Sequence, residues 1–444
     1  MGLDSVLVDS AIYDIVFQGK GKSGFDATDR KVRRVTYDIS PPILELFAKP
    51  FINEPIISFD QSESLTDARL EWHAIHNSSS VVSVKFDSSD LSKYSTGLFK
   101  PVNQGDLQDS VFYRIHIYGT DKAGNVSLPT SVDSIMFDTR PPEVELISPI
   151  HNEFRNFTSI DFTINEPLQS WKIKVKAIAG NPDYNAPHSF QSDSSLYSDV
   201  SMFKELAEVF QLNDGTVYRF ELSAFDRAGN SSADYNVDSV TYDITPPLLT
   251  TIYPATEASI NETAVSFSIN EPLRAGEFRW EQTEGTMDSS APHIIPMIGS
   301  ELLDGDHLKV QLSNQTELID GSVYTLVFAG LDRAGNVGKF LPNTEILFDA
   351  LPPEFTDILP TSGSALNHQH VSYTLSEKVN SGSIMWTWVG GVKDEAAPYT
   401  SQFLETEMNV GKHDSLLLVM NPPLVDGGIY NLEFNAVDRA GKNL

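Results

Sequence analysis

The sequence predicts an all-β fold, built from tandem β-sandwich domains in an elongated array. Two observations predict it: a unit recurs about every 106 residues, and short segments inside each unit alternate apolar and polar residues. The alternation is clear in Tyr218 to Ala224, Tyr324 to Gly330 and Val265 to Ile269, and it is typical of strands with one buried face. Met202 to Phe210 (MFKELAEVF) has a helix-like pattern instead, and we expect a local decoration there.

Two motifs mark the repeat. The motif Asp-x-Ala-Gly occurs four times, and a tyrosine stands eight residues before each of its aspartates. A second motif, Asp-x-x-Pro-Pro, follows the first three copies and also precedes the first full unit. A Pro-Pro pair donates no ladder hydrogen bonds and stiffens the backbone, so this motif predicts a short, semi-rigid joint between domains. The tyrosines are Tyr113, Tyr218, Tyr324 and Tyr430.

These marks divide the chain into five parts. We expect residues 1–40 to form a partial domain with its last two strands, and residues 352–444 to form a domain that lacks its last strand. The complete domains are expected at 41–140, 141–245 and 246–351. Since the repeats start and stop within a unit, the segment is interpreted as an internal part of a longer polypeptide that carries its export and anchoring signals elsewhere.

Composition limits the function classes. The chain of 444 residues has 61 acidic and 31 basic residues, which give a formal net charge of −30 and make nucleic acid an unsuitable partner. It has no cysteine, so disulfides, thiolate metal sites and cysteine nucleophiles are excluded. No stretch approaches the roughly 18 apolar residues of a membrane span, and we expect no direct membrane insertion in this segment.

The ordered set of motifs resembles the bacterial Ig-like domains that occur in tandem in large surface adhesins and other extracellular repeat proteins. The shared elements are Asp-Gly-x-x-Tyr, Asp-x-Ala-Gly-Asn, Asp-x-x-Pro-Pro and a Ser/Asn-Glu-Pro segment, and the resemblance covers nearly the whole chain. It implies Ig-like, fibronectin III-like sandwiches with a tyrosine corner opening strand F and a turn at Asp-x-Ala-Gly-Asn between strands F and G. The turn of the first 40 residues, GKSGF, departs from this pattern.

The resemblance also implies that tryptophans fill the cores from strand C. Trp72, Trp280 and Trp386 each lie nine residues after a repeated glutamate, whereas Trp171 lies five after its glutamate, so we place an alignment gap in the second unit. Trp386 and Trp388 would share one face of a strand, and packing in the core is favoured there over stacking on sugars. Little weight falls on six glycosylation sequons, at Asn77, Asn125, Asn156, Asn230, Asn261 and Asn314.

A cation site is expected at each joint. In an Ig-like sandwich the start of strand A, the B to C turn and the F to G turn share one end, which brings together three acidic residues per joint. Crowded carboxylates repel one another unless a hard cation neutralises them, and Ca²⁺ accepts six to eight oxygen ligands in adaptable geometry. The candidate metal ligands are Asp38, Glu63 and Asp121; Asp138, Glu166 and Asp226; Asp243, Glu271 and Asp332; and Asp349, Glu377 and Asp438.

A purely structural interpretation stands beside calcium. An aspartate that opens a tight turn accepts hydrogen bonds from the amides that follow it, with glycine at the position of positive φ. That role accounts for Asp-x-Ala-Gly-Asn without an ion. It accounts less well for the recurring linker aspartate and strand-B glutamate.

Three functions remain open from the sequence. The first is a structural shaft of an extracellular, bacterial surface protein or filament, whose partners are the neighbouring domains and other copies of the chain. The second is a binding array that recognises glycan or protein through variable loops. The third is an accessory region of a secreted carbohydrate-active enzyme. The sequence shows no catalytic motif, and we expect that the segment is not an enzyme.

Overall fold

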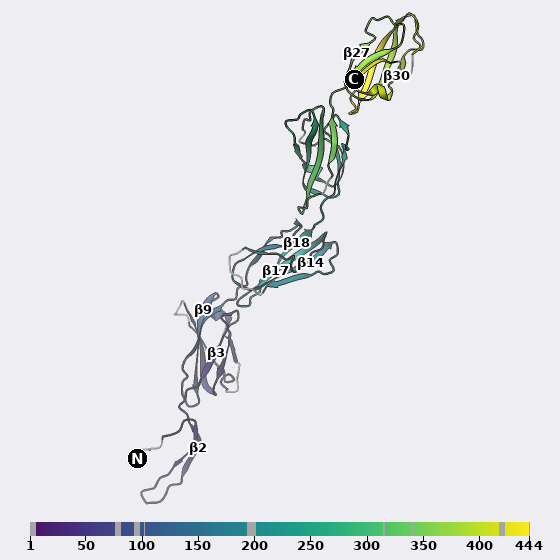
Figure 1. The fold of residues 1–444 in the computed structure, drawn as a ribbon. Helices are drawn as coiled ribbons and strands as arrows, with labels where there is room; N and C mark the ends of the chain where they lie inside the picture. The colour runs from purple at the N-terminus through teal and green to yellow at the C-terminus, as the bar shows by residue number, and fades with distance from the viewer. Residues whose placement is uncertain are drawn as a thin grey trace. The chain divides into compact units, whose positions relative to one another are not determined.

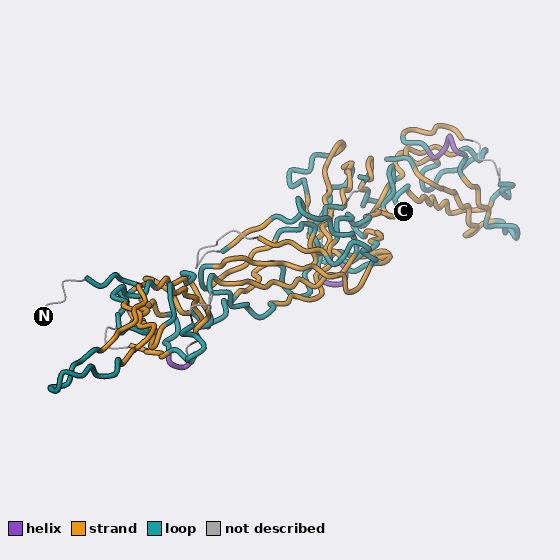
Figure 2. The backbone as a smooth tube through the Cα atoms, turned by 90° about the horizontal axis from the view of Figure 1, so that it is seen from below, coloured by secondary structure: helices purple, strands orange, loops and turns teal. Residues whose placement is uncertain are grey.

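The structure of the chain is a computed structural model that describes residues 6–75, 81–92, 98–101, 103–192, 201–313, 316–338, 341–416 and 422–443. Strands and loops make up nearly all of it, and its helices are the short 3-10 turns η1 (Gln104–Asp106), η2 (Gly299–Leu302) and η3 (Glu405–Met408) (Figure 2). None of the described helices has the length and apolar character needed to cross a membrane. The chain forms two compact units, one of residues 1–153 and 157–241, the other of 154–156 and 242–444.

The first unit begins with a hairpin and one sandwich. The hairpin pairs β1 (Ala11–Phe17) with β2 (Arg30–Tyr37) in antiparallel register. The strands of the first sandwich are β3 (Leu44–Phe47), β4 (Phe51–Ile52), β5 (Ile56–Gln61), β6 (Leu65–Ala74), β7 (Val81–Lys85), β8 (Leu98–Pro101), β9 (Val111–Asp121) and β10 (Thr130–Phe137).

The second sandwich follows, and its β14, β17 and β18 are labelled in Figure 1. Its strands in the first unit are β11 (Val144–Ser148), β13 (Ile160–Ile164), β14 (Leu168–Gly180), β15 (His188–Ser192), β16 (Met202–Lys204), β17 (Thr216–Asp226) and β18 (Tyr235–Tyr242).

The second unit contains β12 and the strands of the third and fourth sandwiches. They are β12 (Phe154–Arg155), β19 (Leu249–Tyr253), β20 (Ser259–Ile260), β21 (Val265–Ile269), β22 (Leu273–Gly285), β23 (His293–Pro296), β24 (Gly305–Val310), β25 (Ser322–Asp332), β26 (Asn343–Phe348), β27 (Phe355–Leu359), β28 (Val371–Leu375), β29 (Val379–Gly391), β30 (Tyr399–Gln402), β31 (Gly411–Leu416) and β32 (Gly428–Asp438).

Each complete sandwich packs a three-stranded sheet on a larger one. In the first sandwich the orders are β3-β5-β8 and β4-β10-β9-β6-β7, and in the third they are β19-β21-β24 and β20-β26-β25-β22-β23. Written with strand letters, these are A-B-E and A′-G-F-C-C′. Strand A therefore crosses between sheets, and its second part pairs in parallel with strand G, as β4 does with β10. This is the predicted Ig-like, fibronectin III-like topology.

Tryptophan and tyrosine side chains form the centre of the cores. Trp72, Trp280 and Trp386 are at most 2% exposed, and each lies edge-on to the strand-F tyrosine of its own sandwich, at centroid distances of 5.8, 6.1 and 6.5 Å. Packing of this kind contributes about 0.5–1.5 kcal/mol beyond the buried area. Trp386 thus fills the core, whereas Trp388 is half-buried and its Nε1 donates to the carbonyl of Val392 at 2.9 Å.

The alignment gap placed before Trp171 is wrong. Strand C has 13 residues in the second sandwich and 13 in the third, and the residue paired with the equivalent position of strand F is Val175 in one and Trp280 in the other. The second sandwich therefore has its tryptophan four residues earlier on a strand of unchanged length. There it contacts Phe162 and Phe190 in a different layer of the core.

The helix-like pattern at Met202 to Phe210 does not form a helix. Met202–Lys204 is instead strand β16, which pairs with β13 at the edge of the three-stranded sheet. The carboxylate of Glu205 then accepts bonds from Thr158 Oγ1 and from the amide of Ala207, which fixes a turn directly after the strand. Pairing with a sheet edge overrides the local helical preference because it satisfies the backbone and buries Leu206.

The tyrosine corner is present in every described copy, and in the second, third and fourth sandwiches the tyrosine hydroxyl also donates to an aspartate. The hydroxyl of Tyr113 accepts the amide of Gln108 at 2.7 Å, and that of Tyr324 accepts the amide of Ile319 at 3.0 Å. The Tyr324 hydroxyl also donates to Asp288 Oδ2 at 2.7 Å, and the same oxygen is 2.6 Å from His293 Nε2. The second sandwich repeats this buried network with Asp183, His188 and Tyr218.

We therefore expect Tyr324→Phe to destabilise its sandwich more than Tyr113→Phe destabilises its own. The first change leaves a buried carboxylate short of a donor, at a cost of about 1–3 kcal/mol, whereas the second removes a corner bond worth about 1 kcal/mol. Hydrogen exchange of the β25 and β9 amides in the full chain measures each local stability. If the two substitutions lower the local stability of β25 and β9 equally, the hydrogen bond from Tyr324 to Asp288 does not add to the stability of the corner.

Candidate metal centres at the joints

Three elements bring one acidic residue each to every joint. The linker aspartate directly follows strand G, as Asp138 follows β10. The glutamate lies two residues before strand C, as Glu166 lies before β14. The hairpin aspartate is the last residue of strand F, as Asp226 is of β17. Because the B to C and F to G turns lie at the same end of a sandwich, a linker that enters at that end meets both side chains.

The structure brings all four predicted sets together. In each set every residue offers one carboxylate oxygen, and these oxygens lie within 4.8 Å of one another. Two oxygens bound to the same Ca²⁺ ion at about 2.4 Å lie at most about 5 Å apart, so this spacing suits a shared ion. The sets of the first unit are Asp38, Glu63, Asp121 and Asp138, Glu166, Asp226; those of the second are Asp243, Glu271, Asp332 and Asp349, Glu377, Asp438.

The hairpin aspartate also stabilises its own turn by accepting hydrogen bonds from the amides that follow it. Oδ1 of Asp121 accepts the amides of Ala123, Gly124 and Asn125 at 2.7–2.8 Å, and Gly124 takes a φ of 96°. Burial alone would raise the pKa of Asp121, but these bonds and that of the Asn125 side chain lower it. The hydrogen bonds therefore hold this aspartate rigidly and favour its ionised form.

The last asparagine of the motif is a functional residue that the sequence analysis left out. Its Nδ2 joins the hairpin aspartate to the linker: Asn230 donates to Asp226 Oδ2 at 2.7 Å and to the main-chain oxygen of Asp138 at 2.8 Å. Asn125 and Asn336 make the same pair of bonds in their joints. Its recurrence after the turn glycine is the sequence signal that could have identified it.

A second group of residues holds the linker from the side of the preceding domain. Oδ1 of Asp109, four residues before Tyr113, accepts the amide and hydroxyl of Thr139, directly after the linker Asp138. Asp320 binds the amide of Ala350 at 2.7 Å in the same way. The aspartate four residues before the strand-F tyrosine, which opens Asp-Ser-x-x-Tyr at Asp109 and Asp-Gly-x-x-Tyr at Asp320, thus has a structural purpose that the motif alone did not reveal.

The electrostatics of the sets oppose full ionisation without a cation. Burial, followed by the charges of Asp138, Asp226 and Asp109, raises the pKa of Glu166 to about 7. Burial, followed by the charge of Asp349, raises the pKa of Glu377 to about 7 as well. Among the described residues no lysine or arginine makes an ion pair with Asp138, Glu166 or Asp226, because Arg140 pairs with Asp109.

The asparagines of four glycosylation sequons are engaged in joints. Asn125 and Asn230 hold their linkers, Asn156 Nδ2 donates to Asn336 Oδ1 at 3.0 Å, and Asn261 Nδ2 donates to the carbonyl of Ala440 at 2.9 Å. A glycan on these amides would break the bonds that they make. Asn77 and Asn314 lie outside the described residues.

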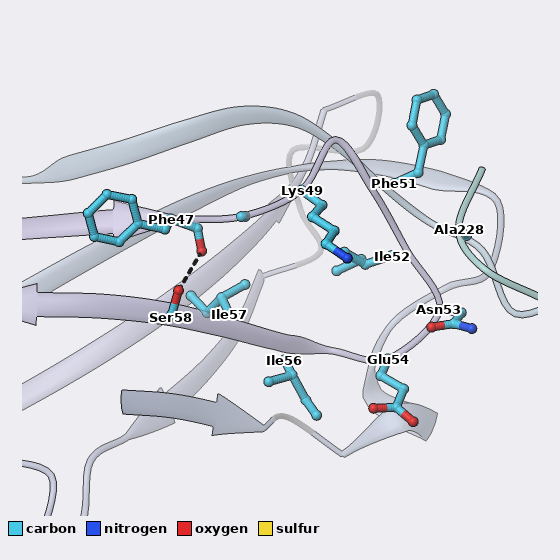
Figure 3. A pocket seen from close by; sticks show the side chains of 11 residues that line it. Phe47, Lys49, Phe51, Ile52, Asn53, Glu54, Ile56, Ile57, Ser58 and Ala228 are labelled. Carbon is cyan, nitrogen blue, oxygen red and sulfur yellow. Dashed lines mark hydrogen bonds between the residues drawn. The ribbon is translucent and has the colours of Figure 1, made fainter. Parts of the chain in front are cut away.

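A hollow of about 600 Å³ lies beside the second joint. It is lined by strands β3, β4 and β5 of the first sandwich and by Ala228 from the F to G turn of the second (Figure 3). Ser58 Oγ donates to the carbonyl of Phe47 across it at 3.5 Å. No cluster of titratable groups lines it, so we assign it no chemistry.

Comparisons with known proteins match the chain weakly. No family model matches it, and no curated protein matches its sequence. Among solved structures it is similar to a tetra-tandem repeat in the extending region of a large adhesion protein, at 17% identity and a TM-score of 0.28 over 91% of this chain and 97% of that one. It is also similar to the FN1–FN3 domains of chicken CNTN1, at 11% identity and a TM-score of 0.25 over 68% of this chain and 96% of that one.

A third similar structure is reported for a 1.5-MDa bacterial ice-binding adhesin, at 13% identity and a TM-score of 0.24 over 70% of this chain and 99% of that one. The class of protein is defined by the topology itself: the chain is a tandem array of Ig-like, fibronectin III-like β-sandwiches.

The raised pKa values predict a pH dependence of the ion-free chain. Because Glu166 has a folded-state pKa near 7 and an ordinary value of 4.5 when unfolded, the folded state prefers its protonated form. Stability therefore falls as the pH rises from about 4.5 to about 7, where the unfolded state has lost the proton that the folded state keeps, and it levels off above pH 7. The lost stability is recovered as the pH falls from about 7 to about 5. Thermal melts in chelator should show this rise, and Glu166→Gln should reduce it and raise the melting temperature at pH 8.

The matched control is Glu208→Gln, which neutralises an exposed carboxylate of the same sandwich. A pH profile that Glu166→Gln leaves unchanged would contradict the electrostatic description of the joint.

Proposed function

We propose that the chain is a segment of a structural shaft in an extracellular surface protein, with joints stiffened by bound Ca²⁺. The observation that carries this proposal is the convergence of three carboxylates at every one of four joints, with the same three elements supplying them each time. A cation site that recurs at each joint would stiffen the whole array. A shaft needs stiffness at every joint because each domain contacts mainly its neighbours.

Charge supports a cation at the joints. Three carboxylates whose oxygens lie within 4.8 Å repel one another once all are ionised. Burial first, and this repulsion second, raise the pKa values of Glu166 and Glu377 to about 7. A divalent ion with oxygen ligands removes it and links the linker to two turns of the next domain. Ca²⁺ is favoured over Mg²⁺ because it accepts irregular sets of carboxylate and carbonyl oxygens.

The linker geometry supports stiffness. The amide of Asp138 donates to the carbonyl of Ile52 of the preceding sandwich, and its own carbonyl accepts Asn230 of the following one. A linker whose backbone bonds are fixed on both sides has few remaining torsions to vary, so a bound ion would lock a joint that is already short. A role in holding a distal domain away from a cell follows from that stiffness.

The same proposal includes a location at the cell surface and no enzymatic activity. A surface location agrees with a cysteine-free array with a net charge of −30. The acidic residues that could act in catalysis recur in every joint, so they support a structural role, and we propose no enzymatic activity for the segment.

The proposal predicts Ca²⁺-dependent stability. Excess Ca²⁺ should raise the melting temperature of the full chain, because an ion bound only by the folded state contributes about 2.7 kcal/mol per site at 100 times its Kd. Titration calorimetry should give four sites. Replacing Asp243, Glu271 and Asp332 together by alanine should leave three sites and reduce the Ca²⁺-dependent shift.

The control removes the same number of charges from exposed positions of the same sandwich, as Glu284, Asp304 and Asp306 to alanine. It should keep all four sites. If the parent chain binds no Ca²⁺ and its melting is unaffected by chelator, the carboxylates serve as turn and linker structure and the calcium part of the proposal fails.

A further inference from the structure

The second joint has side-chain contacts that need no ion. The guanidinium of Arg227, in the F to G turn of the second sandwich, lies 5.5 Å from the ring centre of Phe51 in β4 of the first. Its neighbour Ala228 approaches Asn53, which follows β4 (Figure 3). Asn230 adds the bond from that turn to the linker carbonyl of Asp138. One turn of the second sandwich therefore contacts both the preceding sandwich and the linker.

The fourth joint has lost two of these contacts by substitution. Ser259 in β20 stands where Phe51 stands in β4, so this position offers no ring to Arg439. Lys442 stands where the other joints have asparagine, and it gives its main-chain amide to Asp438 Oδ1 at 2.7 Å. No side-chain amide there donates to the linker carbonyl of Asp349 among the described residues.

The lost asparagine leaves a buried oxygen of the hairpin aspartate without a partner. Asp438 is 1% exposed, and its Oδ2 has no hydrogen-bond partner, whereas the equivalent oxygens of Asp121, Asp226 and Asp332 each accept an asparagine Nδ2. Among the described residues Lys442 makes no ion pair with this carboxylate or with the other two of the set. A buried carboxylate oxygen in this state is costly unless something binds it.

Other contacts of the fourth joint are kept. The amide of Asp349 donates to the carbonyl of Ile260 at 2.8 Å, and Asp320 holds the amide of Ala350, so the linker stays tied to the third sandwich. Between the third sandwich and the turn of the fourth, Asn261 donates to the carbonyl of Ala440 at 2.9 Å. The side chain of Asp349 also shares a hydrogen bond with Glu377 of the fourth sandwich. Among the described residues, the missing bond is the one from the F to G turn of the fourth sandwich to the linker carbonyl.

We infer that the fourth joint is an ion-dependent hinge, ordered when a divalent cation binds Asp349, Glu377 and the free Oδ2 of Asp438, whereas the second joint is held by side-chain contacts without an ion. The inference rests on the proposed calcium sites and assigns them different tasks. In the second joint the ion adds to an existing clamp. In the fourth it replaces the asparagine, because it alone links the hairpin aspartate to the linker.

The test uses the full chain, in which the absence of native cysteine allows labelling at chosen sites. Spin labels on Ser83→Cys and Ser189→Cys span the second joint, and labels on Ile294→Cys and Thr400→Cys span the fourth; all four positions are exposed. Distance distributions are measured in chelator and in excess Ca²⁺. We expect the second joint to give a narrow distribution in both conditions, and the fourth to be broad in chelator and narrow with Ca²⁺.

Two reciprocal variants test the cause. Ser259→Phe with Lys442→Asn should narrow the fourth joint in chelator, and Phe51→Ser with Asn230→Lys should broaden the second, with Ca²⁺ restoring it. Circular dichroism verifies that each variant remains folded. A fourth joint that is narrow in chelator, or that stays broad although calorimetry shows its site filled, overturns the inference.

The failure of the proposed function gives a different result. In that case calorimetry detects no Ca²⁺ binding at any joint, and neither distribution changes between chelator and Ca²⁺. If only the inference about the fourth joint fails, calorimetry still detects four Ca²⁺ sites, and the distance distributions of the second and fourth joints change in the same way between chelator and Ca²⁺.

Discussion

The interaction on which the array depends is the fixing of a linker aspartate, such as Asp138, between the preceding and the following sandwich. Its amide and the next residue are held by the preceding sandwich, as Asp138 and Thr139 are by Ile52 and Asp109. Its carboxylate is directed at a glutamate and an aspartate of the following sandwich. Because these bonds involve the backbone, the linker enters the next domain at one place, and that place determines which carboxylates meet.

This arrangement crowds carboxylates together, and their repulsion lowers the stability of the folded sandwiches. Glu166 and Glu377 have pKa values near 7 because burial and neighbouring carboxylates oppose their ionisation. Rigid cores keep the carboxylates from moving apart: strand F ends in the hairpin aspartate, and the same strand carries the tyrosine that packs on the central tryptophan. The stability of the core and the crowding at the joint are thus linked through one strand.

The repeated architecture also allows the joints to differ. The turn that follows strand F has the same backbone in each sandwich, with glycine at φ of 88–98° in all four copies. Single substitutions on this constant frame, such as Lys442 for asparagine, change what the turn can bind without changing its shape. Variation among joints therefore resides in side chains at a few positions, while the acidic sets stay constant.

The sequence alone determined the repeat, the sandwich topology and the twelve acidic residues, because period, strand alternation and recurring motifs are local properties of the chain. It misassigned Met202 to Phe210, where pairing with a sheet edge overrides a local pattern, and it placed a gap at Trp171 where the core had moved its tryptophan to another layer. The tertiary structure alone decided which atoms meet. The amide of Asn230 and the carboxylate of Asp109 act on a linker that is distant in sequence, and the unpartnered oxygen of Asp438 depends on a side chain missing from a folded turn. These contacts depend on the distances between residues far apart in the sequence and on their burial, and neither can be obtained from a single residue or motif.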